Sequence, residues 1–310
     1  MTHPIVIGTR GSTLALWQAR AVENAFRTAF PELQTELRVI STLGDKILDK
    51  PLERIGDKGL FTKDLEKALL SGEVDLCVHS MKDLTTILPE GCAIGAMLPR
   101  ADARDVLVCG PRIKGASSLS DVPTGARLGT GSVRRSSQLR ALFPHIEPKP
   151  IRGNVDTRLE KANGPDFEGV ILAAAGVERM GETARIAARI PVEEMVPSVG
   201  QGAIGIEIRK DDERILSLCC AIDDEITNAC VTAERKLLAA LKGGCQAPIG
   251  AFARFENGKP VFDAVVCALD GSRRAYVHLD SIDPDEALLK LRAEGAEDIL
   301  AGNQSTGTAR

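Results

Sequence analysis

The chain has 310 residues, of which 44% are hydrophobic and 26% are charged, and its formal net charge is −4. This composition is typical of a folded globular protein, and it argues against a largely disordered chain or a basic nucleic-acid-binding protein. At about 100–200 residues per domain, the length predicts two or three domains. Because only 3% of the residues are aromatic, we expect cores built from aliphatic side chains.

The eight cysteines and four histidines lack the spacing of a metal site, and the sequence contains no CxxC pair. The chain opens on a strand-like segment with no signal-peptide pattern, and it contains no run of 18 apolar residues. We therefore expect reduced thiols, no bound metal, no membrane span and a cytoplasmic location.

The first two thirds of the chain alternate between strand-like and helix-like segments, a pattern that predicts βαβ units. Ser12 is the expected N-cap of the first helix. The expected strands include residues 4–10, 35–42, 74–80 and 105–110, and the expected helices include residues 12–30 and 60–72.

The last third has a different pattern. Residues 223–244 read as one long helix that ends at two glycines. Residues 249–281 read as three strands separated by the turn sequences "ENGK" and "DGS", and a further helix is expected at about 284–300. These elements predict a small α+β domain.

Three expected strand ends share one design, with glycine, a hydroxyl or amide residue, a helix start and arginine: "IGTRGS" (7–12), "LGTGSVRR" (128–135) and "IRGNVDTR" (151–158). Helix N-termini and arginine both favour anions. Taken singly, each corner is explained equally well by a simple N-cap and a solvated arginine. Together they favour a ligand with several carboxylates, because none of them matches a nucleotide-binding motif.

Asp83 follows the apolar strand 74–80, in the segment "VHSMKDL". A carboxylate held in a basic cleft stabilises a developing cation or transfers a proton. The alternative is an aspartate that only caps the next turn.

Cys245 lies in "LKGGCQAPIG", whereas the other cysteines mostly lie in apolar segments. It follows the C-terminal end of an expected helix, where the helix dipole opposes a thiolate, and no neighbouring group activates it. From the residues alone, an idle loop thiol is the simpler interpretation.

Taken in order along essentially the whole chain, these segments resemble the porphobilinogen deaminase family, also called hydroxymethylbilane synthases. The segments that carry the resemblance are "GTRGSTLALWQA", "GDKGLFTKDLE", "VHSMKDL", "GTGSVRRSSQL", "RGNVDTRLEK", "ILAAAGVERMG", "VGQGAIGIE" and "GGCQAPIG".

The resemblance implies an α/β fold with two doubly wound lobes, similar to a two-lobed periplasmic binding protein, and a small α+β domain with a three-stranded sheet. The implied domains are residues 1–100 with 198–218, residues 101–197, and residues 219–310.

The resemblance also implies a monomeric transferase that condenses four porphobilinogen molecules, with loss of ammonia, onto a dipyrromethane cofactor. Hydrolysis then releases hydroxymethylbilane. In the family the cofactor is attached through a thioether to the cysteine of "GGCQ", which is Cys245 here. Porphobilinogen is the only partner that we expect.

Asp83 matches the family's catalytic aspartate. The positions that match cofactor-binding residues are Lys58, Phe61, Lys82, Asp83, Thr130, Ser132, Arg134, Arg135, Arg158 and, covalently, Cys245. The positions expected to bind substrate are Arg10, Ser12, Arg152, Asn154, Arg179 and Gln201. Gly131 departs from the family pattern, since many members have serine there.

Two other functions remain open from the residues. One is a non-catalytic two-lobed binding protein for an organic polyanion. The other is a nucleic-acid-binding regulator that uses residues 127–158, which contain seven Arg or Lys residues and two acidic residues. This block lacks the aromatic platforms of single-strand binders.

Overall fold

The computed structural model of the protein describes residues 4–42, 62–242 and 247–307. Predictions for three residues therefore lie outside the described part of the chain: Lys58, Phe61 and Cys245.

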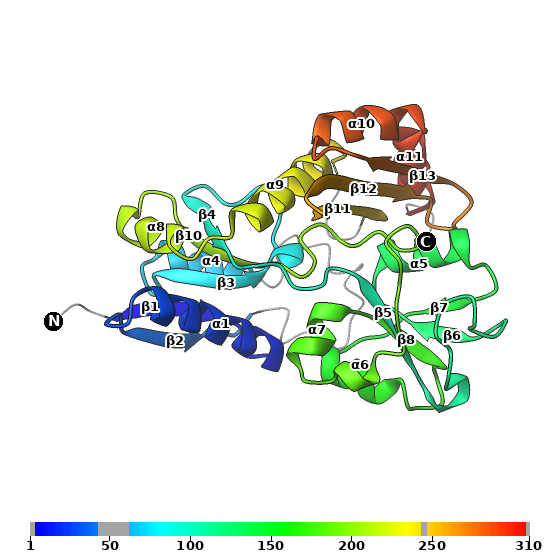
Figure 1. Ribbon diagram of the computed structural model, residues 1–310, viewed down its shortest axis with the longest axis horizontal. Helices are drawn as coiled ribbons and strands as arrows, with labels where there is room; N and C mark the ends of the chain where they lie inside the picture. Colours follow the sequence, from blue (N-terminus) through cyan, green and yellow to red (C-terminus); the bar gives the residue numbers. More distant parts are fainter. Residues whose placement is uncertain (1–3, 43–61, 243–246, 308–310) are drawn as a thin grey trace. The chain divides into compact units, whose positions relative to one another are not determined.

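The chain forms two compact units (Figure 1). The first unit comprises Met1–Ala101 and Gly202–Ala229, and the second comprises Asp102–Gln201 and Cys230–Arg310. Each unit thus contains two separate stretches of sequence, because the chain leaves the first unit after Ala101 and returns to it at Gly202.

A five-stranded mixed sheet in the order β2-β1-β3-β10-β4 forms the centre of the first unit. Strand β1 is parallel to β2 and β3, whereas β10 is antiparallel to β3 and β4. The strands are β1 (Ile5–Thr9), β2 (Thr35–Val39), β3 (Leu76–Ser80), β4 (Cys92–Met97) and β10 (Ile204–Arg209), and the helices include α1 (Thr13–Ala29), α4 (Lys63–Leu70) and α8 (Glu213–Cys220).

The apolar pattern of the first segments explains this core. Ile5 and Ile7 of β1 are fully buried, as is Phe26 on the apolar stripe of α1. Ser12 is the N-cap of α1, as predicted, because its Oγ accepts a hydrogen bond from the amide of Ala15 at 3.3 Å. The chain therefore enters α1 directly from the end of β1.

The second unit contains another five-stranded mixed sheet, in the order β7-β6-β8-β5-β9. Strand β6 is parallel to β7 and β8, whereas β5 is antiparallel to β8 and β9. The elements are β5 (Asp105–Cys109), β6 (Arg127–Gly129), α5 (Val133–Leu142), β7 (Glu147–Lys149), α6 (Val155–Lys161), β8 (Gly169–Ala173), α7 (Ala174–Arg179) and β9 (Ala188–Arg189).

The antiparallel strands β5 and β10 depart from the expected βαβ pattern. Both follow a point where the chain passes from one unit to the other: β5 begins shortly after Ala101, and β10 begins shortly after Gln201. A strand that enters a sheet from outside is not constrained by a helical crossover within that sheet, so its direction is free to reverse.

The predicted three-stranded sheet is confirmed as β11-β12-β13, with antiparallel pairing throughout. The turn between the first two strands places Asn257 and Gly258 at positive φ, which suits a tight hairpin turn. In Figure 1, α10 and α11 lie on one side of this sheet. The elements are α9 (Glu225–Ala240), β11 (Ile249–Glu256), β12 (Lys259–Cys267), β13 (Arg274–Leu279), α10 (Pro284–Ala293) and α11 (Ala296–Gly307).

We predict that Gly205→Ala destabilises the first unit. Gly205 on β10 pairs with His79, and a Cβ atom there would lie 2.0 Å from Sδ of the buried Met81. Relieving this clash must move Met81, which begins the turn that carries Asp83. Overpacking of this kind costs about 1–3 kcal/mol, measured as a lower free energy of unfolding in urea.

The control is Gly302→Ala in α11, where no described atom lies within 4 Å of the new Cβ. Alanine favours a helix over glycine by about 0.5–1 kcal/mol, so this variant should be at least as stable as the wild type. Equal stability of the wild type and Gly205→Ala would contradict the prediction.

Candidate active site

The first unit brings two of the predicted segments to one edge of its sheet. Strands β1 and β3 are parallel neighbours, with Ile7 opposite Leu76. Their carboxyl ends therefore meet at the same edge, which is where open α/β sheets bind ligands. The segment after β1 supplies Arg10 and Ser12, and the segment after β3 supplies Asp83.

A pocket forms where these segments meet. Asp83 is exposed at the end of a short 3₁₀ turn, Met81–Asp83, and it shares the pocket with a cation and several hydrogen-bonding groups. The residues that line the pocket are Arg10, Ser12, Leu14, Ala15, Gln18, Thr62, Val78, His79, Ser80 and Asp83. Gln18 donates a hydrogen bond from Nε2 to Oγ of Ser80 at 2.7 Å, which links α1 to the end of β3.

One residue that lines this pocket, His79, belongs to a buried polar pair. Nε2 of His79 lies 3.0 Å from Oε2 of Glu207, and both side chains are almost completely buried. Glu66 is buried in the same region, and burial raises its pKa. Burial and the nearby carboxylates of Glu207 and Glu66 raise the pKa of Cys92 to about 12, so this thiol stays protonated at neutral pH.

The second unit brings the other two arginine-bearing corners together. Strands β6 and β7 are parallel, with Gly129 opposite Lys149, so the segments that follow them are neighbours. A Cβ atom at Gly131 would lie 2.8 Å from the carbonyl oxygen of Ile151 and 3.9 Å from Nη2 of Arg158. Glycine therefore leaves room for this close approach of the two corners.

The hydroxyl and amide residues of these corners act as helix caps. Oγ of Ser132 accepts from the amide of Arg135 at 3.5 Å, and the amide of Ser132 donates to Oγ1 of Thr130 at 3.2 Å. Oδ1 of Asn154 accepts from the amide of Thr157 at 3.0 Å. The capping role that the sequence left open is therefore present, and it does not by itself exclude a ligand at either corner.

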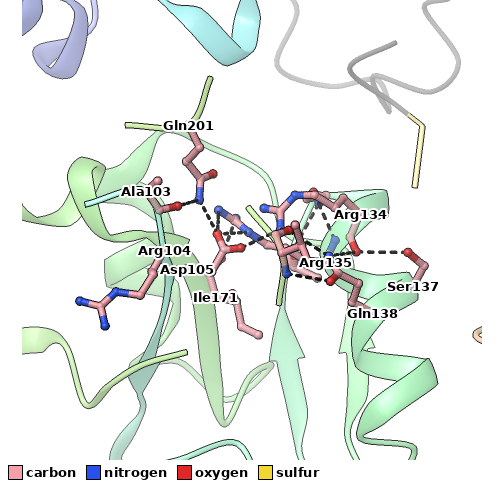
Figure 2. Close-up of polar contacts among 12 residues, drawn as sticks. Ala103, Arg104, Asp105, Arg134, Arg135, Ser137, Gln138, Ile171 and Gln201 are labelled. Atoms are coloured by element: carbon pink, nitrogen blue, oxygen red, sulfur yellow. Dashed lines mark hydrogen bonds and ion pairs between the residues drawn. The ribbon is translucent and has the colours of Figure 1, made fainter. Parts of the chain in front are cut away.

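Arg134 and Arg135 both point to one buried carboxylate (Figure 2). Asp105, at the start of β5, accepts from Nη1 of Arg134 at 2.7 Å and from Nε of Arg135 at 2.9 Å. Gln201 donates from Nε2 to the same carboxylate at 2.9 Å and to the carbonyl oxygen of Ala103 at 2.7 Å. Burial raises the pKa of Asp105, but the charges of the two arginines outweigh burial and lower it to about 2.

The remaining predicted residues have separate positions. Lys82 and Arg152 are half-buried, and Arg158 donates from Nε to the carbonyl oxygen of Gly153 at 2.9 Å. Arg179 ends α7, where burial lowers its pKa to about 10, so it remains charged at neutral pH. The structure thus groups Arg10, Ser12 and Asp83 in the first unit, and it groups Arg134, Arg135 and Gln201 around Asp105 in the second.

Sequence reasoning missed three buried polar residues: His79, Glu207 and Asp105. Each is a polar side chain within or at the start of an otherwise apolar strand, as in "DLCVHS", "AIGIEI" and "RDVLVC". Buried polar groups need partners, so these interruptions of apolar strands were a usable signal.

Two of the seven basic residues in the block 127–158 form ion pairs with nearby glutamates. Arg127 pairs with Glu168 at 2.9 Å, and Lys149 pairs with Glu147. In the described part of the chain, no group of three His, Cys, Asp or Glu side chains is arranged to hold a metal ion. None of the described helices is both long and apolar enough to cross a membrane.

Two family models match this chain. The model described as "Porphobilinogen deaminase, dipyromethane cofactor binding domain" matches residues 5–217. The model described as "Porphobilinogen deaminase, C-terminal domain" matches residues 228–294.

Similar proteins cover nearly the whole chain. The porphobilinogen deaminase of Desulforudis audaxviator (strain MP104C) is 47% identical over 307 residues, which cover 97% of this chain and 98% of that protein. The porphobilinogen deaminase of Thiobacillus denitrificans (strain ATCC 25259 / T1) is 43% identical over 304 residues, which cover 96% and 98%. Among solved structures, substrate binding domain 2 of Lactococcus lactis GlnP in its open conformation is similar with a TM-score of 0.46 and 10% identity, covering 76% of this chain and 89% of that one. From the two family models and the two similar porphobilinogen deaminases, the chain belongs to the porphobilinogen deaminase family.

Proposed function

We propose that this chain is a transferase that condenses four porphobilinogen molecules head to tail on a covalently bound dipyrromethane and then releases hydroxymethylbilane by hydrolysis. The match to both domains of the family carries this proposal. It is supported by the pocket in the first unit, where the carboxylate of Asp83 lies among the ligand-binding groups Arg10 and Ser12.

The chemistry of the pocket suits this reaction. Porphobilinogen carries an acetate and a propionate, and a guanidinium such as that of Arg10 binds carboxylates well. When the aminomethyl C–N bond breaks, ammonia leaves and the pyrrole becomes a cation. The carboxylate of Asp83 stabilises that cation until a new C–C bond forms and a ring proton is lost.

The residues of the second unit fit a polycarboxylate cofactor. Nε of Arg134 is buried and has no hydrogen-bond partner among the described residues, so it has a donor left for an anion. When bound, the dipyrromethane supplies the free pyrrole position on which the chain is extended. We propose that Cys245 attaches it and that the following residues hold its carboxylates or rings: Lys58, Phe61, Lys82, Asp83, Thr130, Ser132, Arg134, Arg135 and Arg158.

We assign the incoming substrate to Arg10, Ser12, Arg152, Asn154, Arg179 and Gln201. Arg10 and Ser12 share the pocket with Asp83, which supports their part of this assignment. Gln201 already donates hydrogen bonds to Asp105 and to the carbonyl oxygen of Ala103. Its proposed effect on a ligand is therefore indirect, through these hydrogen bonds.

We further propose that the chain works as a monomer in the cytoplasm. All seven cysteines that the structure describes are free thiols, which suits a reducing compartment. A non-catalytic binding protein for an organic polyanion is not favoured by family membership, and turnover of porphobilinogen distinguishes the two functions.

Replacing Asp83 should slow the reaction strongly. Loss of one preorganised electrostatic partner typically costs on the order of 10²–10³ in rate, so Asp83→Ala should lose at least this much. Asp83→Glu keeps the negative charge and should lose less. The measurement is single-turnover uptake of porphobilinogen by protein that already carries the cofactor.

The control is Glu90→Ala, which removes an exposed carboxylate on the same segment outside the pocket. It should retain the wild-type rate. If Asp83→Glu were as slow as Asp83→Ala, charge stabilisation alone would be an insufficient explanation of the role of Asp83.

Intact mass tests the covalent cofactor directly. The purified wild type should be heavier than its sequence by two condensed pyrrole units, and Cys245→Ser should lack this excess. Cys220→Ser is the control, since Cys220 is an exposed thiol outside "GGCQ" and this variant should keep the excess mass. A wild type without excess mass that also gains none on incubation with porphobilinogen would overturn the proposed function.

A further inference from the structure

Asp105, Arg134, Arg135 and Gln201 form a cluster, called the Asp105 cluster below, that has more positive than negative charge. One carboxylate faces two guanidinium groups, and only 4–6% of the side-chain surface of either arginine is exposed. Among the described residues, no second acidic group pairs with Arg134 or Arg135. An excess buried cation is costly, so the cluster favours an additional anion.

The two arginines differ in the donors that they have left. All three nitrogens of Arg135 are engaged: Nε and Nη2 contact Asp105, and Nη1 donates to the carbonyl oxygen of Ile171 at 2.9 Å. Among the described residues, Arg134 has partners at Nη1 alone, which donates to Asp105 and to the carbonyl oxygen of Val196 at 2.7 Å each. Its Nε is buried without a partner in the described part of the chain.

The unused edge of Arg134 is the one that binds carboxylates elsewhere in this chain. Arg104 donates from Nε at 3.0 Å and from Nη2 at 2.8 Å to the two oxygens of Asp102. Arg127 contacts the two oxygens of Glu168 through the same pair of nitrogens, at 3.2 Å and 2.9 Å. This fork geometry is the preferred bidentate arrangement between arginine and a carboxylate.

We propose that Asp105 is a positioning residue that presents the Nε/Nη2 edge of Arg134 to a carboxylate of the pyrrole ligand. Asp105 holds Nη1 of Arg134 from one side, so the opposite edge of the guanidinium keeps one orientation. Gln201 fixes Asp105 in turn, since it bonds both that carboxylate and the backbone of Ala103 (Figure 2). Arg135 is the counter-ion that keeps Asp105 charged. The identity of the ligand rests on the proposed function, whereas the geometry of the cluster does not.

Asp105→Asn tests this proposal, because it keeps the shape of the side chain and removes its charge. Asp263→Asn is the matched control, since Asp263 is also a buried aspartate, bonded to Arg254 at 2.6 Å and to Tyr276 at 2.6 Å in the C-terminal sheet. Both variants should unfold at a lower temperature than the wild type. Only Asp105→Asn should also lose pyrrole loading and extension, by about 10- to 100-fold, the effect of one charged hydrogen bond.

Loading and extension are measured as intact mass before and after incubation with porphobilinogen. A double-mutant cycle with Arg134→Leu separates positioning from general support of the fold. If Asp105 acts through Arg134, Asp105→Asn should cost less than about twofold when Arg134→Leu is already present. A multiplicative loss in the double variant, or normal loading of Asp105→Asn, would overturn the proposal.

A small dicarboxylate gives a readout that does not depend on the reaction. In proteins that carry Cys245→Ser, and therefore no cofactor, malonate should raise the melting temperature of the parent and of its Asp263→Asn variant, and it should have a smaller effect on the Asp105→Asn and Arg134→Leu variants. Equal effects on all four proteins would overturn the positioning role even if the enzyme is active. A malonate response of the Cys245→Ser parent, together with a wild type that takes up no porphobilinogen, would overturn the proposed function and leave the positioning role supported.

Discussion

The direction of neighbouring strands determines where the chemistry of this protein can lie. In both five-stranded sheets, parallel neighbours end at one edge, so segments far apart in sequence must meet there. Residues 10–12 and Asp83 are about 70 positions apart, yet β1 and β3 deliver them to one pocket. The same constraint places the segment after β6 beside the segment after β7. Without parallel pairing, these polar corners would be isolated helix caps.

The antiparallel strand of each sheet has a different role. Strand β10 supplies Glu207, which holds His79 on the pocket wall, and β5 supplies Asp105, which holds two arginines. In both cases a strand that joins the sheet after the chain has changed units contributes a fully buried carboxylate. Such a carboxylate is stable only when a cation or a hydrogen-bond donor satisfies it, so it fixes the side chains around it. These two strands therefore add rigidity to the groups that the parallel strands bring together.

The sequence predicted the elements that depend on local patterns. The N-cap at Ser12, the hairpin turn at Asn257 and Gly258, and the three C-terminal strands follow from signals a few residues long. The antiparallel direction of β5 was not predictable, because it depends on how the chain re-enters a sheet. The sequence also did not predict which residues pair with Asp105. Its partners, Arg134 and Arg135, are 29 and 30 positions away, and their sequence pattern is that of ligand-binding arginines.

Net charge is a poor guide to what this protein binds. The whole chain carries −4, which taken alone disfavours an anionic ligand, and the basic block 127–158 suggests the opposite. Burial separates these groups, because Lys149 pairs with Glu147 and Arg127 shares Glu168 with Arg112 in partly exposed ion pairs, whereas the excess positive charge that the described residues leave around Asp105 is buried. Burial weakens screening by water and salt, so a buried charge attracts a carboxylate more strongly than the same charge would at the surface. If the proposed carboxylate binding at Arg134 is correct, a few buried groups and their geometry determine it, and the net charge of the chain does not predict it.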